Sequence, residues 1–526
     1  MLAIHIDEGE ENNVKNCAAM SYHHLSRRWF RPECIFLIFF LLMGLPAALL
    51  IPAGGGFDEP SHVARIDQLS YGQIMSEAVA TSSGVAVEDA AMGDILYGGS
   101  IDKGLVETAD ENLKTYQVSD AAGETYSFPT WISASLSSAE VYGSAQTVYV
   151  FSNTAVYSPV SYIPQVIALC VGRLFISNAY ALIVLMRVAG LLFIAFVIFF
   201  CIRVIPIGKW TMVFIGLLPS FVISNAQVTA DTMTDAVLFV FITCTFIFLL
   251  RGAEASRKDW SALVISSLML GLVKVSYLPI VALLGAVPLM RADMRKRMYI
   301  GRLVLIVMGA IAMFLVWYGM IKSINTGAMF ATGANPGAQL SFVIQHPLHF
   351  LRLLTSLFVT TNILNLTLTG IIAAVSSAKL IPCWWIEAIL LCLSVSMEDQ
   401  REQSLSLSNR NLFLLLASCV IVFILVFSVI GLAIYLQFNP IEAAIISGVQ
   451  PRYFIPILPV LLLPIAVFVR WYWGNEINGN QIGRVDSEQG HLFISQSKYV
   501  VSSTIISVIY FFMSFSVLFV LFVNLF

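Results

Sequence analysis

The dominant pattern along this chain of 526 residues is a series of long apolar runs separated by shorter polar segments. Residues 34–53 form the first run, with no charged side chain. A helix rises about 1.5 Å per residue, so a run of this length crosses about 30 Å of hydrocarbon. We therefore predict a spanning helix here. The polar leader before it, residues 1–33, contains Arg27, Arg28 and Arg31 near its end, which places the N-terminus in the cytoplasm.

Further apolar runs follow from residue 157 to the end of the chain. The predicted segments are residues 160–175, 179–202, 211–228, 234–250, 261–290 with an interruption at Lys274, 303–321, 350–374, 380–397, 411–436, 454–469 and 500–526. Together with the first helix they predict about 11–13 transmembrane helices, which means an all-α polytopic membrane protein. Residues 157–470 form its multi-helix membrane domain, and residues 500–526 form its last helix.

Basic connectors set the predicted orientation. Residues 251–258 and 291–302 are rich in Lys and Arg and, together with the loop 471–499, are predicted to be cytoplasmic, whereas residues 322–347 and 438–451 are predicted to be external. Strict alternation fails between residues 157 and 251, because one crossing per run would place Arg251 outside. One run there is therefore re-entrant or crosses twice. The polar content of residues 350–374 predicts a helix at the outer interface or along a cavity.

One long polar region, residues 54–156, directly follows the first helix. It holds fourteen acidic and three basic side chains. This deficit of Lys and Arg after a helix with a basic cytoplasmic flank predicts an extracytoplasmic loop. A loop of this length is usually functional or disordered. We expect its two ends, rich in aromatic residues, Pro and Gly, to be ordered, and residues 82–91 and 119–124 to be flexible.

Composition supports the membrane interpretation and excludes other classes. Hydrophobic residues make up 58% of the chain and charged residues only 12%, about half the charged share of a soluble domain. The net charge of -3 argues against a nucleic-acid-binding protein, which would present a basic face. None of the eight cysteines lies in the long polar loop, so neither a disulfide framework nor a zinc site is indicated.

The densest chemical signal is the sequence Phe-Asp-Glu-Pro-Ser-His-Val-Ala-Arg at the outer end of the first helix. Asp58 and Glu59 are adjacent carboxylates, with His62 and Arg65 close behind. If Pro60 begins a short helix, Glu59, His62 and Arg65 share a face. The group is a candidate acid/base and charge-pairing cluster. An interfacial cap with solvated charges is the alternative.

A second motif re-enters the membrane after the long loop. It contains Tyr157, Tyr162 and Gln165, with prolines at positions 159 and 164. Substrate binding is one interpretation, and a rigid entry with an interfacial aromatic belt is the other. Arg187 lies deep in the next apolar run. It therefore either needs a partner in the membrane or snorkels to the interface.

Three further groups carry charge at membrane depth. Asp231 and Asp235 lie one helical turn apart and face a cation, a metal or a hydroxyl-rich substrate, unless they belong to a simple loop. Lys274 interrupts an apolar region, so its ammonium faces a cavity or an anion. Arg452, beside Tyr453, either holds a phosphate bidentately or anchors a helix.

These residues together resemble a known family, the bacterial polytopic membrane proteins grouped as domain-of-unknown-function family 2142. The motifs that match are residues 57–62 with Arg65, residues 157–159 and 162–165, Pro219 with Gln227 and Asp231, Lys274 with Tyr277, and residues 448–456. Their order spans most of the chain, from about residue 35 to residue 470. Two features differ from the family pattern: Pro451 stands where relatives have glycine, and a Gly-Leu-Gly-Trp-like turn is missing at residues 370–379.

That family looks like the GT-C class of membrane glycosyltransferases. The resemblance implies transfer of a sugar from a polyprenyl-phosphate donor to a saccharide, lipid or protein acceptor, on the outer face of the bacterial cytoplasmic membrane. In that class an acidic residue of the first external loop acts as base or holds a metal ion, and the matching positions here are Asp58 and Glu59. Mg²⁺ or Mn²⁺ is therefore a cofactor candidate.

The resulting hypothesis assigns Asp58 as general base, with Glu59 orienting it or a metal, and Arg452 and Lys274 neutralising the leaving phosphate. His62, Arg65, Tyr157, Tyr162, Gln165, Asp231 and Tyr453 are the further predicted substrate-binding residues. Two alternatives stay open. A transporter or flippase of lipid-linked saccharides would use the same charges to escort its substrate, and a non-catalytic envelope protein would bind a partner through its acidic loop.

Overall fold

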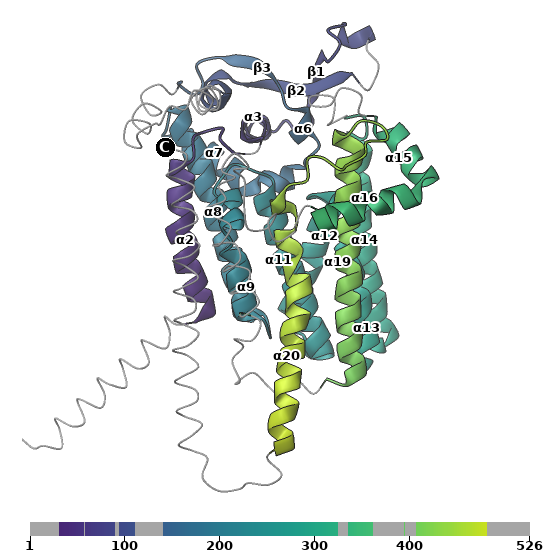
Figure 1. The fold of residues 1–526 in the computed structure, drawn as a ribbon. Coiled ribbons are helices and arrows are strands. Elements are labelled where there is room, and N and C mark those ends of the chain that lie inside the picture. The colour runs from purple at the N-terminus through teal and green to yellow at the C-terminus, as the bar shows by residue number, and fades with distance from the viewer. Residues whose placement is uncertain are drawn as a thin grey trace, which may run out of the picture.

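The computed structural model describes residues 31–56, 58–89, 94–110, 140–324, 335–360, 394 and 407–480. In these ranges the chain is a helical bundle with one small β-sheet (Figure 1). The prediction of an all-α polytopic membrane protein is confirmed. The predicted segments 500–526 and, apart from residue 394, 380–397 lie outside the described residues, as does most of the leader.

The elements follow one another along the chain with mostly short connections. The α-helices are α2 (Pro32–Leu50), α3 (Glu59–Ser70), α6 (Ser152–Ala155), α7 (Ile163–Gly172), α8 (Ala179–Val204), α9 (Lys209–Gly216), α10 (Pro219–Asn225), α11 (Asp231–Arg251), α12 (Arg257–Leu270), α13 (Ala286–Met290), α14 (Arg297–Ile321), α15 (Pro336–Gln345), α16 (Pro347–Thr360), α19 (Asn409–Phe438) and α20 (Leu458–Asn480). The strands are β1 (Glu77–Thr81), β2 (Ile95–Asp102) and β3 (Gln146–Val150), and the 3-10 helices are η1 (Val87–Asp89), η2 (Pro159–Tyr162), η3 (Gly252–Glu254), η4 (Val275–Gly285), η5 (Ala292–Arg295), η8 (Pro451–Tyr453) and η9 (Ile455–Ile457).

Five of the described helices are long and apolar enough to cross a membrane, and they correspond to α2, α8, α11, α14 and α19. Shorter apolar helices cover Pro159–Gly172, Val275–Met290 and Ile455–Val469. The long helices differ in burial. Within its apolar span, α11 is 89% buried and α14 only 11%. Among the described helices, α11 therefore lies at the centre of the bundle and α14 at its edge.

Two predicted segments are divided in the structure. The run 211–228 consists of α9 and α10, which are separated at Leu218 because the residue before Pro219 takes an extended conformation (ψ 131°). The run 261–290 consists of α12 followed by η4 and α13. Lys274 lies at the turn between these two passes, so the interruption seen in the sequence is the point where the chain reverses direction.

Helix α7 accounts for the failure of strict alternation. Just before it, the carbonyl of Tyr157 accepts a bond from Arg65 (3.2 Å). Just after it, the amide of Ala179 donates to Glu140 (3.1 Å). Both ends therefore contact the region 54–156. Its ten residues rise only about 15 Å, too little to cross the hydrocarbon, so α7 enters and leaves at the same end of the bundle.

The described residues of the region 54–156 form a small domain over one end of the bundle, which we call the sheet end (Figure 1). Its three strands are antiparallel in the order β1-β2-β3, with an irregularity in register between Ala78 and Ala80. Helix α3 lies beneath the sheet, and the Asp67 carboxylate accepts the amide of Asp102 on β2 (2.8 Å). The described ends of this loop contain α3 and the three strands, and the strands were not predicted. Residues 119–124, which were predicted to be flexible, lie outside the described residues.

The opposite end of the bundle carries the basic connectors, and we call it the basic end. Arg291 donates to the carbonyls of Leu250 and Arg251 (both 3.2 Å). Asn411 at the start of α19 donates to Met290 (3.1 Å). These bonds bring the connectors after α11 and α13 and the start of α19 together, far from the sheet.

Candidate functional site

Three charged side chains from distant parts of the chain meet near the sheet end. Asp231 is the first residue of α11, Lys274 lies at the turn before η4, and Arg452 lies in η8. The Lys274 ammonium contacts Asp231 Oδ1, and Arg452 Nε lies 3.1 Å from Asp231 Oδ2. None of the three side chains is more than 12% exposed. We call Asp231, Lys274 and Arg452 the charged triad.

The charged triad carries one net positive charge, because two cations share one carboxylate. A buried charge is costly unless a partner compensates it. A site with an excess of buried positive charge next to a cavity therefore favours an anionic ligand. Arginine and lysine are the usual side chains for phosphate, arginine through its planar fork and lysine as a point charge.

Tyrosine rings surround the cations of the triad. Lys274 Nζ lies 5.6 Å from the ring centroid of Tyr157 and 4.9 Å from that of Tyr453. The Arg452 guanidinium lies 5.5 Å from the Tyr453 ring. Cation–π contacts at such distances stabilise a desolvated charge. The hydroxyl of Tyr277 on η4 donates to the Tyr453 carbonyl (2.8 Å) and holds this segment against the bundle.

His62 on α3 is a neutral group beside the triad. Its Nδ1 lies 2.7 Å from the hydroxyl of Tyr162, and its ring stacks on Tyr157 at 5.9 Å. Burial lowers the pKa of His62 to about 3; Asp231 raises it, whereas Lys274 and Arg452 lower it. The imidazole is therefore uncharged near neutral pH. It supports the Tyr157 ring that faces Lys274.

Asp58 directly precedes α3 and is exposed. Its backbone is left-handed (φ 54°), and its side chain makes no capping bond to the helix, although aspartate at this position commonly caps. Burial raises the pKa of Tyr157; Lys274 lowers it, and Asp231, Tyr453 and Asp58 raise it. Asp58 is thus a solvent-facing carboxylate that acts electrostatically on Tyr157, one of the tyrosines beside the triad.

Glu59 does not behave as the sequence predicted. It is fully buried and paired with Arg187 on α8, with Oε1 2.7 Å from Nε and Oε2 2.5 Å from Nη2. The same oxygens accept the amides of Val228 (2.9 Å) and Gly56 (3.1 Å). Its carboxylate is fully engaged inside the protein. The structure therefore gives Glu59 a structural role rather than that of a catalytic group or metal ligand.

Arg65 and Gln165 are also structural rather than substrate-facing. The fully buried Arg65 donates to Gln68, to Ser76 Oγ (3.2 Å) and to the carbonyls of Ile74 (2.7 Å) and Tyr157. Burial lowers its pKa to about 10. Gln165 Nε2 donates to the Thr229 carbonyl (3.2 Å), just before Asp231. Both side chains hold the backbone around the site instead of lining it.

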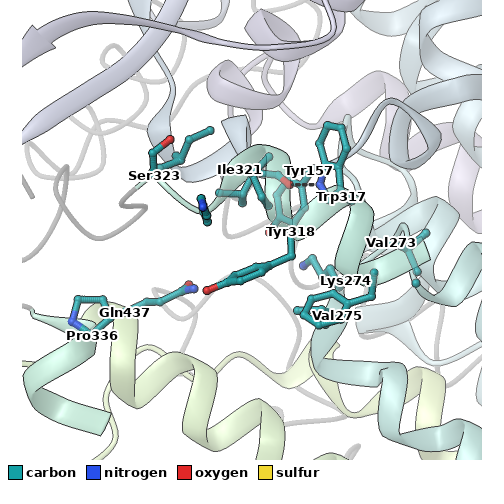
Figure 2. A pocket seen from close by; sticks show the side chains of 15 residues that line it. Tyr157, Val273, Lys274, Val275, Trp317, Tyr318, Ile321, Ser323, Pro336 and Gln437 are labelled. Atoms are coloured by element: carbon teal, nitrogen blue, oxygen red, sulfur yellow. Dashed lines mark hydrogen bonds between the residues drawn. The ribbon is translucent and has the colours of Figure 1, made fainter. Parts of the chain in front are cut away.

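A cavity of about 440 Å³ adjoins the triad (Figure 2). Lys274 and Tyr157 form part of its wall, and the end of α14 provides Phe314, Trp317 and Tyr318. The Trp317 indole donates to the carbonyl of Val156 (2.8 Å), which joins α14 to the small domain. Figure 2 shows the Tyr318 side chain pointing across the cavity toward Gln437 of α19. The volume lies within the range of ligand pockets.

The predicted metal pair, Asp58 and Glu59, does not fit a divalent ion. Both oxygens of Glu59 already accept hydrogen bonds from Arg187 and two amides. Within the described ranges, no group of three or more His, Cys, Asp or Glu side chains is placed to hold a metal.

The structure brings together Asp231, Lys274, Arg452, Tyr453, Tyr157, Tyr162 and His62, with Asp58 nearby. Sequence reasoning missed the cavity residues Trp317, Tyr318 and Gln437, because they look like ordinary interfacial residues. It gave a partner in the membrane as one of two interpretations of Arg187, since a guanidinium in an apolar run signals one. It had no means to identify that partner as Glu59.

Comparison with known proteins decides the family. The model of a family described as "Predicted membrane protein (DUF2142)" matches residues 40–461. The chain belongs to this family. The matched range of DUF2142 includes Asp58, the charged triad and every cavity-lining residue named above. No curated protein and no solved structure matches the chain, so the family establishes a membrane protein without assigning it a reaction.

Proposed function

We propose that this DUF2142 protein is a membrane glycosyltransferase that moves a sugar from a polyprenyl-phosphate donor to a cell-envelope acceptor. One observation carries the proposal: two buried cations, Lys274 and Arg452, share the single carboxylate of Asp231 beside an aromatic cavity. Such a site suits a monoanionic or dianionic phosphate attached to an apolar chain. The exposed carboxylate of Asp58 supplies a base on the same side.

The proposed reaction uses few groups. Asp58 accepts the proton of the acceptor hydroxyl as its oxygen attacks the anomeric carbon of the sugar. The bond between that carbon and the phosphate oxygen breaks, and the electron pair leaves with the polyprenyl phosphate. Lys274 and Arg452 stabilise the negative charge that develops on the phosphate. Asp231 holds both cations in place before the donor arrives.

The cavity provides room for the first units of the donor's apolar chain. Its wall includes Phe314, Ile321 and Val275 in addition to the aromatic residues of α14. The remaining surface of α14 is directed to lipid, since Leu315 and Val316 are 57% and 65% exposed. Among the described residues, the end of α14 thus lies between the lipid-facing surface of this helix and the cavity beside the triad.

Orientation follows from the two ends of the bundle. Lys and Arg residues that flank spanning segments mark the cytoplasmic side. The basic end would then face the cytoplasm, and the sheet end with Asp58 and the triad would face outward. We therefore place the reaction on the outer face of the bacterial cytoplasmic membrane, with the N-terminus inside.

Binding of the carrier alone tests the phosphate site. We expect purified protein in nanodiscs to bind polyprenyl phosphate with at least tenfold higher affinity than the uncharged polyprenol, and Lys274→Met to remove that difference. Leu315→Ala, at a lipid-facing position of α14 outside the cavity lining, is the matched control and should bind like the native chain. Equal affinity for the phosphate and the alcohol would contradict the proposal.

A transporter of lipid-linked saccharides is the second candidate. The interrupted helices α9 and α10 favour it, because discontinuous helices beside a buried charged site are typical of transporters. Saturable carrier binding that depends on Lys274, without sugar transfer to any acceptor, would favour this candidate over the enzyme.

A further inference from the structure

The buried pair formed by Glu59 and Arg187 connects more of the chain than an ion pair requires. Besides Glu59, the Arg187 guanidinium donates to the carbonyls of Ala48 (3.1 Å), Ile51 (2.5 Å) and Pro52 (2.8 Å). These carbonyls belong to the end of α2 and the residues after it, where a helix leaves acceptors without internal partners. Arg187 therefore fixes the point at which the chain leaves the first membrane helix.

Glu59 extends this connection to both acidic residues of the site. Its Oε2 accepts the amide of Gly56, two residues before Asp58, and its Oε1 accepts the amide of Val228, three residues before Asp231. Asp58 is also the residue directly before Glu59. One carboxylate therefore holds the turn that carries the candidate base and the segment that leads to the triad.

The fit around this carboxylate is close. A Cβ at Gly56 would lie 2.6 Å from the side-chain oxygen of Gln227 and 3.1 Å from Cβ of Glu59. The turn that carries Asp58 therefore lies directly against the Gln227 side chain, next to Val228. A small displacement of the Glu59 carboxylate would move the two segments relative to each other.

We propose that Glu59 and Arg187 are positioning residues, which set the separation between the Asp58 carboxylate and the charged triad. They touch neither the proposed donor nor the acceptor, and they act through the backbone of residues 56–58 and 228–231. The catalytic part of this inference rests on the proposed function. The structural part, that one ion pair fixes two segments relative to each other, does not.

Loss of a positioning residue lowers the reaction rate more than it weakens ligand binding, which distinguishes it from loss of a residue that only stabilises the fold. Lys274 and Arg452 come from the η4 turn and from η8, which the pair does not contact. Both cations also have a contact that does not involve Asp231, because the Tyr453 ring centroid lies 4.9 Å from Lys274 Nζ and 5.5 Å from the Arg452 guanidinium. Binding of the carrier phosphate should therefore change much less than the rate when the pair is lost. A displacement of about 1 Å between base and acceptor is enough to reduce a rate by about a hundredfold. A merely destabilised protein would instead lose binding sites and activity in equal proportion.

Arg187→Lys is the first variant to measure. It keeps the charge balance with Glu59, but an ammonium lacks the planar fork that reaches the carboxylate and three carbonyls together. The double variant Glu59→Met with Arg187→Met removes both charges, which avoids an uncompensated buried ion. Asp67→Asn is the matched control, because Asp67 is buried on the same helix but bonds to β2 and Tyr142 instead.

In a sugar-transfer assay we expect kcat to fall about ten- to a hundredfold in Arg187→Lys and in the double variant. The dissociation constant and the stoichiometry of polyprenyl phosphate binding should stay within about threefold of the native values, and Asp67→Asn should keep its kcat. An unchanged kcat in both variants, or a loss of activity matched by a loss of binding sites, would overturn the proposal.

Hydrogen exchange separates this inference from the proposed function. Even if the native chain transfers no sugar, we expect the amides of segments 53–58 and 226–231 to exchange faster in Arg187→Lys, because Glu59 is no longer held in place. The amides of Asp102 and Leu105, on the far side of α3, should not change. Unchanged exchange in both segments would show that the pair does not hold them.

Discussion

At the scale of single residues, the site depends on which charged side chains are paired inside the protein and which are accessible to a ligand. Asp58 and Glu59 are adjacent in the sequence and have opposite environments. Glu59 is buried and bonded to Arg187, whereas Asp58 is exposed and left-handed in its backbone. Backbone strain of this kind is concentrated at functional sites. The adjacent carboxylates therefore divide into a structural residue and a candidate base.

Removal of the Glu59 charge is predicted to reduce stability strongly. Glu59→Gln leaves the buried Arg187 guanidinium without its counterion, a change that costs about 3–5 kcal/mol in other proteins. Thermal unfolding in detergent measures the effect. Asp58→Asn, one position earlier but exposed, should change stability by less than about 0.5 kcal/mol. Equal melting temperatures for both variants would contradict the structural role of Glu59.

The sequence predicted most members of the site because each is polar in an apolar context. Asp231, Lys274 and Arg452 were each identified in this way, and the resemblance to DUF2142 grouped them. Sequence spacing could not predict that the three residues contact one another, since they come from three elements far apart along the chain. Arg65 and Gln165 are also polar residues in an apolar context, but they bond to backbone carbonyls. The sequence signal therefore does not distinguish a ligand-facing group from a structural one.

At the scale of elements, the small domain is joined to the bundle through α3 and α7. Asp67 of α3 accepts the amide of Asp102 on β2 and the hydroxyl of Tyr142 (3.1 Å). Tyr142 also accepts a bond from Arg173, directly after α7 (3.4 Å). These contacts link sheet, loop and re-entrant helix through one carboxylate.

Stability is predicted to depend on pH through Asp67. Burial raises its pKa to about 6, opposed chiefly by the bond from the Asp102 amide, compared with 3.8 for an ordinary aspartate. The folded state thus binds a proton on the Asp67 carboxyl group more tightly than the unfolded chain does. The stabilisation of the folded state that results is complete below about pH 4 and is lost as pH rises to about 6. The loss is on the order of 3 kcal/mol.

Asp67→Asn removes the titrating group and checks this sign. The stability of the native chain relative to Asp67→Asn should decrease between pH 4 and pH 7, as measured by denaturant unfolding at each pH. A constant difference over that range would show that Asp67 does not titrate there.

The connection after α2 depends on a close backbone approach. Gly54 has φ +80°, and a Cβ there would lie 2.1 Å from the Ala109 carbonyl oxygen. Gly54→Ala should therefore destabilise the protein by several kcal/mol, because backbone must move. Gly72 has φ +78° with nothing within 4 Å, so Gly72→Ala should cost only the conformational strain, about 1–2 kcal/mol. Similar melting temperatures for the two variants would contradict this packing.

Hydrophobic length predicted the long helices well and the short elements poorly. The runs 34–53, 179–202 and 411–436 correspond closely to α2, α8 and α19, since a lipid-exposed span needs one continuous apolar run. The strands were missed because β2 contains two adjacent glycines, Gly98 and Gly99, and lacks a clear alternation. The interruption at Leu218 and the reversal at Lys274 occur within apolar runs, without a long polar segment, and so leave a weak signal.

At the scale of the whole molecule, a helical bundle presents a small sheet domain at one end and basic connectors at the other (Figure 1). The site lies between the bundle and this domain. Helix α7 does not cross the membrane. The crossings from α8 to α11 therefore place the basic connectors on one side of the membrane. The arrangement predicts a single orientation in the membrane.

Cysteine labelling in whole cells tests that orientation. In a variant without native cysteines, Val85→Cys in the exposed turn after β1 should react with a membrane-impermeant maleimide. Lys258→Cys at the basic end should react only after the membrane is permeabilised. The reverse pattern would place the site in the cytoplasm and contradict the proposed location of the reaction.

Sugar transfer by the purified protein is the most direct test of the central claim. The native chain and Asp58→Asn would be offered radiolabelled polyprenyl-phosphate sugars with a cell-envelope extract as acceptor. We predict transfer by the native chain and a loss of at least a hundredfold in Asp58→Asn, with carrier binding retained because Lys274 and Arg452 are intact. Full activity in Asp58→Asn would contradict the assignment of the base, and carrier binding without transfer by the native chain would contradict the enzyme.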